Sequence, residues 1–137
     1  MAIFPSQEWI ELFQKGINES EAYRSAAKRW EGTFLFVVEP DLKFKDEVGV
    51  FADLWHGSCR NISLMPPPFE KKADYIWKGR YTDWMKLLRG DLEAPQGIVS
   101  GKFRIDGNVM NLLSRRSPFA ANELVIIARK VPTAFHP

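Results

Sequence analysis

The sequence predicts an α+β domain built on a five-stranded, mostly antiparallel sheet. Three observations predict it. Helix-like and strand-like segments come in separate runs rather than in strict alternation, which is typical of α+β folds. The predicted strands are short and end at turn residues. The length of 137 residues suits one domain with one core, so residues 1–137 are expected to form a single domain.

Two helices are predicted at the start of the chain. Ser6 can cap the first, in which apolar residues recur at helical spacing until Gly16, where a left-handed stop is usual. Asn18, followed three residues later by Glu21, resembles a capping box and predicts a second helix. Gly32 is the expected end of that helix.

Four segments supply the five strands. Residues 33–38, TFLFVV, are β-branched and aromatic without polar alternation, which predicts a central strand covered on both faces. Residues 48–65 predict a hairpin that turns at residues 56–58, and the polar second arm indicates an edge strand. Residues 73–79 and 102–106 predict the remaining two strands.

Further helices are predicted around the last strand. Thr82 can cap a helix that stops at Gly90, and Pro95 suits a first helical position. Asn108 is expected to cap another helix, and a final helix is expected from Pro118 onward.

Charge and composition exclude several classes of function. The 19 Lys and Arg against 17 Asp and Glu give a net charge of +2 without a long basic run, so nucleic acid is a poor candidate partner. Two histidines and one cysteine make a metal centre improbable, and no cofactor motif occurs. The lone Cys59 suits a reducing compartment, and no export signal or long apolar run is present. We therefore expect a cytoplasmic protein.

Aromatic residues, at 13% of the chain, are abundant. Filling a core is their usual use, and lining a cavity for an apolar ligand is the alternative.

Residues 70–108, EKKADYIWKGRYTDWMKLLRGDLEAPQGIVSGKFRIDGN, resemble the sterol carrier protein type-2 domain family. The resemblance consists of a strand after a KKAD-like turn, a capped helix with a glycine stop, and a polar link with a proline. A short apolar turn and the GK-hydrophobic-basic-Ile-x-Gly-Asn pattern then follow. These elements occur in the order and spacing of that family, over about a third of the chain.

The resemblance implies helices on one face of the sheet, an apolar tunnel and no catalysis. The ligands that it implies are fatty acids, fatty acyl-CoA, sterols or other lipids. It is also compatible with transient membrane contact, and with either a monomer or a homodimer. The expected ligand-binding residues lie on elements around the fifth strand, and each suits an ordinary core equally well. They are Trp84, Leu88, Ile98, Phe103, Ile105, Met110, Leu113, Phe119 and Leu124.

Two other classes of function fit parts of the sequence. Small cone-shaped isomerases and cyclases also combine helices, curved strands and an aromatic pocket, and Asp53 or His56 would then be the general base. An exposed strand face explains Asp53 more readily. Domains resembling this family also occur as accessory or dimerisation modules of larger enzyme systems, which is the third interpretation.

Overall fold

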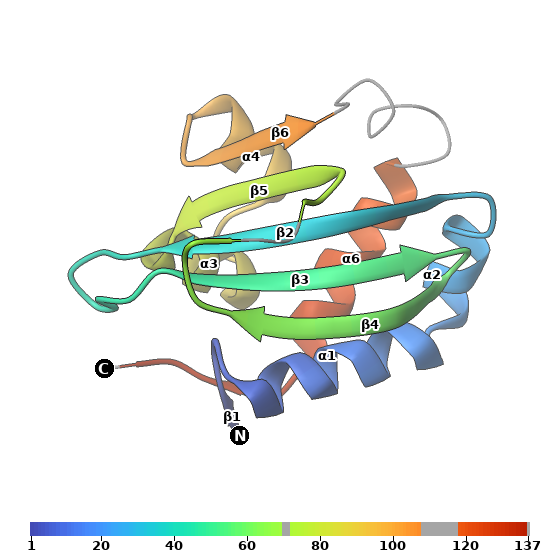
Figure 1. The fold of residues 1–137 in the computed structure, drawn as a ribbon, viewed down its shortest axis with the longest axis horizontal. Coiled ribbons are helices and arrows are strands. Elements are labelled where there is room, and N and C mark those ends of the chain that lie inside the picture. The colour runs from blue at the N-terminus through green and yellow to red at the C-terminus, as the bar shows by residue number, and fades with distance from the viewer. Residues whose placement is uncertain (70–71, 108–117, 137) are drawn as a thin grey trace.

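The computed structural model describes residues 1–69, 72–107 and 118–136 (Figure 1). Side chains are described for the same residues except those of 118–120. In chain order the elements are β1 (Ala2–Ile3), α1 (Gln7–Glu19), α2 (Glu21–Ala26), β2 (Glu31–Glu39), β3 (Val48–Trp55), β4 (Ser58–Met65), β5 (Tyr75–Arg80), α3 (Tyr81–Arg89), α4 (Ala94–Val99), β6 (Phe103–Gly107), α6 (Pro118–Lys130) and β7 (Thr133–Ala134).

The main sheet has five strands in the order β4-β3-β2-β5-β6. Only the β2–β5 pair is parallel among these neighbours, and the other three pairs are antiparallel. Helices α3 and α6 lie behind the sheet in Figure 1, and α1 runs along β4. The predicted α+β class and the mostly antiparallel sheet are confirmed.

Strand β2 lies at the centre of the sheet and is buried on both faces, as the apolar run in residues 33–38 predicts. Phe34 and Val38 belong to the main core on the helix side. Leu35 and Val37 belong to a smaller core on the opposite face, where the ring of Phe69 packs against them from the β4–β5 connection. The edge position predicted for β4 is also confirmed.

Gly16 does not end α1, contrary to the prediction, because the helix continues to Glu19. The glycine instead provides space for a neighbouring helix. A Cβ atom at Gly16 would lie 2.8 Å from Cγ2 of Ile127 in α6, closer than real Cβ contacts allow. The residue therefore permits close packing of α1 against α6.

The predicted limits of the second helix are wrong at both ends. Ser20, rather than Asn18, caps α2, and its Oγ accepts a hydrogen bond of 3.0 Å from the amide of Tyr23. The amide oxygen of Asn18 instead accepts a hydrogen bond from the backbone N–H of Cys59 in β4. The helix ends at Ala26, and Gly32 lies inside β2.

Helix α3 begins one residue before the predicted cap. Thr82 lies in its first turn and donates hydrogen bonds from its amide and its hydroxyl to the carboxylate of Asp41, at 2.7 and 2.6 Å. An acidic side chain from the β2–β3 loop thus satisfies a free amide of the helix, where a negative charge is also favourable. The predicted stop at Gly90 is confirmed by its positive φ of 86°.

Glycines lie at the start and at the end of the segment that contains β6. Gly101, in the turn before the strand, has a φ of 81°, and Gly107, the last residue of the strand, has a φ of 125°, both in the region that favours glycine. The ring of Phe103 sits between Gly79 of β5 and Gly97 of α4, where added Cβ atoms would approach it to 2.5 and 2.3 Å. This close approach fixes α4 against the edge of the sheet.

The two ends of the described chain form a short parallel pair that the sequence pattern did not predict. Ala2 of β1 pairs with Thr133 of β7. Strands of two residues are too short to give a periodic signal. The helix predicted from Asn108 lies outside the described residues, whereas α6 begins at Pro118 as predicted. Within the described ranges, no helix is both long and apolar enough to span a membrane.

Candidate functional site

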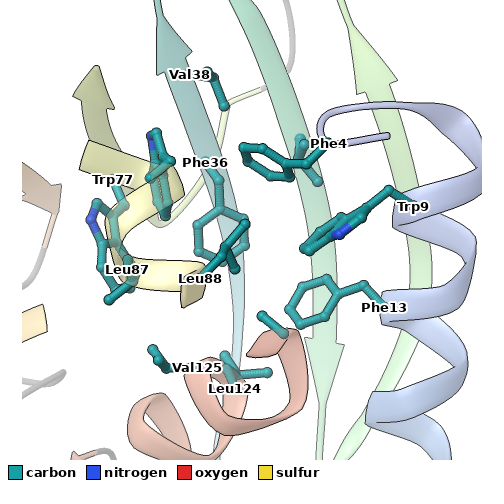
Figure 2. A pocket seen from close by; sticks show the side chains of 13 residues that line it. Phe4, Trp9, Phe13, Phe36, Val38, Trp77, Leu87, Leu88, Leu124 and Val125 are labelled. Atoms are coloured by element: carbon teal, nitrogen blue, oxygen red, sulfur yellow. The ribbon is translucent and has the colours of Figure 1, made fainter. Parts of the chain in front are cut away.

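An apolar cavity of about 50 Å³ lies between the inner face of the sheet and helices α1, α3 and α6 (Figure 2). Its floor is formed by side chains of three neighbouring strands: Phe36 and Val38 of β2, Val50 of β3 and Trp77 of β5. Phe36 is paired in register with both Val50 and Trp77, so these residues point to one face. The sheet register thereby concentrates apolar surface at one place.

Three aromatic rings form the side of the cavity next to α1. Phe4 precedes the helix, and Trp9 and Phe13 lie one turn apart on it. The centroid of the Trp9 ring is 4.9 Å from that of Phe4 and 5.3 Å from that of Phe13. Figure 2 shows these rings following one another along one side of the cavity. Aromatic packing of this kind gives a continuous carbon surface.

Helices α3 and α6 supply the remaining walls, each from one helical face. On α3 the second and third residues follow the first by three and four positions, and on α6 they follow it by one and four positions. This spacing places each set on one side of its helix. They are Trp84, Leu87 and Leu88 of α3 and Leu124, Val125 and Ala128 of α6.

No nitrogen or oxygen atom of the described residues is exposed in the cavity wall. Two of the lining indoles have their N–H groups bonded away from it. Trp9 Nε1 donates to Oγ1 of Thr133 at 2.8 Å, and Trp84 Nε1 donates to the carbonyl oxygen of Val37 at 3.0 Å. A wall made only of carbon surface offers no group for acid–base or nucleophilic chemistry, and it suits an apolar ligand.

The structure brings three of the nine predicted ligand-binding residues together in this wall: Trp84, Leu88 and Leu124. Phe103 is 1% exposed and lies behind the lining, with its ring centroid 5.6 Å from Trp77 and 5.1 Å from Trp84. Ile105 packs against the same core without lining the cavity. These two residues support the tryptophans rather than face the space.

The other four predicted residues divide into two groups. Ile98 is 42% exposed on α4 and does not line the cavity. Met110 and Leu113 lie outside the described residues, as does the side chain of Phe119, whose backbone belongs to α6.

Sequence reasoning missed much of the floor and the α1 side of the cavity. The apolar run in residues 33–38 indicates burial on both faces and so does not reveal that Phe36 faces the helices. The signal for Trp9 and Phe13 was present, because their spacing predicts one helical face. What the pattern lacks is the long-range pairing that brings this face opposite α3.

The two candidate general bases lie away from the cavity. Asp53 is on the opposite face of the sheet from Phe36, and its carboxylate forms an ion pair of 3.2 Å with Arg60. His56 lies in the β3–β4 turn, with Nδ1 2.8 Å from the carbonyl oxygen of Lys28 and Nε2 3.6 Å from the carboxylate of Glu31. Neither side chain lines the cavity.

Cys59 is also poorly placed for chemistry. The thiol is buried, and burial raises its pKa to about 11, so it is protonated and unreactive near neutral pH.

Among the described residues there is no group of three His, Cys, Asp or Glu side chains that could hold a metal ion.

Comparison with known proteins gives one family. The model of the SCP-2 sterol transfer family matches residues 10–119. No curated protein matches the sequence significantly.

Solved structures show the same likeness. A crystal structure of sterol carrier protein 2 is 35% identical and has a TM-score of 0.81, with 92% of this chain and 97% of that chain covered. A conserved hypothetical protein from Thermus thermophilus, solved in solution, is 34% identical with a TM-score of 0.81 and coverage of 94% and 90%. The apo form of sterol carrier protein 2 from Yarrowia lipolytica shares the fold at 18% identity, with a TM-score of 0.61 and coverage of 93% and 94%.

Proposed function

The chain belongs to the SCP-2 sterol transfer family, a family that binds and transfers lipids, and we propose that it carries a lipid whose apolar part enters the cavity described above. The ligand classes that we propose are fatty acids, fatty acyl-CoA, sterols and other apolar lipids. The proposal assigns no catalytic step to the chain, because the cavity wall offers carbon surface alone.

The observation that carries the proposal is the purely apolar wall. Transfer of a methylene group from water to such a surface is favourable by about 0.8 kcal/mol. A chain of about a dozen carbons therefore needs no polar anchor to bind well. With no hydrogen-bonding group exposed in the wall to discriminate between ligands, selectivity rests on shape and length, so we expect it to be loose.

The size of the cavity sets a condition on binding. At about 50 Å³ it is well below the ~300 Å³ or more of a usual ligand site. A bound chain must therefore displace side chains of the wall. Leu88 is only half-buried at the end of α3, so it can move toward solvent at less cost than Leu87, which is 2% exposed.

Any charged or polar head group would remain outside this wall. Burial of a charge without a partner costs several kcal/mol or more, and the lining provides no partner. The proposal therefore places the tail inside and the head group in contact with solvent.

A chain-length series tests the proposal. A fluorescent polyene fatty acid is added to the protein in aqueous solution, and energy transfer from the tryptophans reports its binding, because Trp9, Trp77 and Trp84 all line the cavity. Saturated fatty alcohols of increasing length then compete with the probe. We expect about a fourfold gain in affinity per added methylene, until the chain exceeds the space that the wall can provide. Absence of energy transfer, or competition independent of length, would contradict the proposal.

A further inference from the structure

The turn between β3 and β4 packs against the last turn of α2 and the residues that follow it. The backbone N–H of His56 donates a hydrogen bond of 2.9 Å to the carbonyl oxygen of Trp30. Gly57 lies so close to α2 that an added Cβ would be 2.7 Å from Cα of Arg24. Residues 24–31 and 53–60 thus form one surface, at the end of the molecule where Figure 1 shows α2 beside the hairpin; we call it the hairpin end.

Trp55 is the exposed aromatic residue of the hairpin end. It is 43% exposed, although tryptophan is usually well buried. The guanidinium carbon of Arg60 lies 5.2 Å from the centroid of its ring, within the range of a cation–π contact. The His56 ring meets its edge at a centroid distance of 4.4 Å. These contacts hold the indole in place while leaving much of it in solvent.

The charge of the hairpin end is positive. Its two segments contain four cationic residues, Arg24, Lys28, Arg29 and Arg60, against two acidic residues, Glu31 and Asp53. All four cations are exposed. The excess of two positive charges equals the net charge of the whole protein, so the remainder of the chain is balanced.

We propose that the hairpin end docks on an anionic phospholipid bilayer, with Trp55 at the level of the head groups and Lys28 and Arg29 against the lipid phosphates. The inference rests on the proposed function, because a lipid carrier must meet the membranes that supply and receive its ligand. Tryptophan is enriched at membrane interfaces, where its ring has an apolar body and a polar N–H. Nearby cations add attraction to an anionic surface.

The opposite end of the sheet provides a control. Leu42 is fully exposed in the loop between β2 and β3, so it is more accessible than Trp55. Residues 41–47 of that loop contain three acidic and two basic side chains. An anionic surface would repel this loop, and exposure of an apolar residue without positive charge does not predict docking.

Vesicle co-sedimentation tests the proposal on the full chain. Vesicles of phosphatidylcholine are compared with vesicles in which about a third of the lipid is phosphatidylglycerol. We expect the wild type to bind the anionic vesicles. The Lys28→Gln, Arg29→Gln double variant should bind about twenty- to thirty-fold more weakly, at about fivefold for each charge. Trp55→Ala should also bind more weakly, whereas Leu42→Ala should bind like the wild type.

A second measurement locates the indole. Phosphatidylcholine brominated on its acyl chains quenches a tryptophan that reaches the bilayer. We expect the wild type to be quenched in anionic vesicles and Trp55→Phe to lose that part of the quenching. Wild-type affinity of the double variant, or equal quenching of wild type and Trp55→Phe, would overturn the proposal. Failure of the wild type to bind vesicles of either composition would also overturn it and leave an acidic protein as the partner to examine.

Uptake of the polyene fatty acid from solution, without vesicles, separates this proposal from the proposed function. Variants of the hairpin end should take up the probe like the wild type, because none of the substituted residues lines the cavity. If the wild type itself does not take up the probe, the proposed function fails. If uptake is normal and vesicle binding does not depend on Trp55, Lys28 and Arg29, only the docking surface fails.

Discussion

Replacement of Leu88 by arginine tests the position of the cavity. Leu88 lines it from α3 and is half-buried, so an arginine there can extend its charged end to solvent while its stem stays against the wall. The fold should tolerate the change at a cost of about 1–2 kcal/mol in the free energy of unfolding. The bound lipid should be affected more strongly.

The expected loss of affinity follows from the contact removed. Burial of a leucine side chain contributes about 1.5–3 kcal/mol of free energy. A ligand that contacts an arginine stem in place of Leu88 loses most of this contribution. We therefore expect Leu88→Arg to weaken binding by roughly 10- to 150-fold. The arginine stem also occupies part of the 50 Å³ cavity, which the ligand must enlarge to enter, and this weakens binding further.

The assay is competition for the bound fluorescent polyene by an uncharged fatty alcohol. An uncharged competitor is needed because the carboxylate of a fatty acid could pair with the new arginine. Ile98→Arg is the matched control: Ile98 was predicted to contact the ligand, but it is exposed on α4 and does not line the cavity. Wild-type affinity in a folded Leu88→Arg protein, or an equal loss in Ile98→Arg, would refute the assignment of the wall.

Three further predictions concern residues and conditions outside the cavity. Asp53→Asn and His56→Ala should leave lipid affinity unchanged, since neither side chain lines the wall; a turnover activity that disappears in either variant would support an enzyme instead. Affinity measured by probe titration should change little between about 0.05 and 0.5 M salt, because apolar burial drives binding, and a steep decrease would indicate contacts to phosphate or coenzyme A. Asp41→Asn should lower the free energy of unfolding at pH 7 by about 1 kcal/mol, measured with urea. Burial alone raises the pKa of Asp41, but hydrogen bonds from Thr82 and the backbone lower it overall. Its stabilising effect is therefore present above the unfolded value of about 3.9 and is lost as the pH falls through the lower folded pKa. A difference between Asp41→Asn and wild type that does not shrink as the pH falls below about 3.9 would contradict this explanation.

The sequence predicted the class of the fold because its strongest local signals agree with the final structure. The run in residues 33–38 can be buried on both faces only in a central strand, and β2 occupies that place. Gly90 predicted the end of a helix from its conformational freedom, and it ends α3 with a positive φ of 86°. Such signals depend on a few neighbouring residues, so a sequence reveals them directly.

Helix boundaries were predicted less well because long-range contacts decide them. Gly16 suits a helix end by its propensity, yet packing against Ile127 keeps it inside α1. The first turn of α3 is satisfied by Asp41, which is 41 residues from Thr82 in the chain. No local pattern around Thr82 contains that partner.

The cavity wall was predicted only in part for the same reason. Trp84 and Leu88 were identified from a helical face within the segment that resembles the family, residues 70–108. Phe36 and Trp9 come from segments that the motif does not include, and they meet the α3 residues through the sheet register and the packing of α1. Ile98 has the right composition and position in the motif, but α4 turns it outward.

Native mass spectrometry of the freshly purified protein, followed by solvent extraction and identification of what is released, shows whether the chain carries a lipid. We expect a fatty acid, a sterol or another apolar lipid bound at close to one molecule per chain. A protein that carries no lipid and also fails to take up the fluorescent polyene would show that the chain is not a lipid carrier.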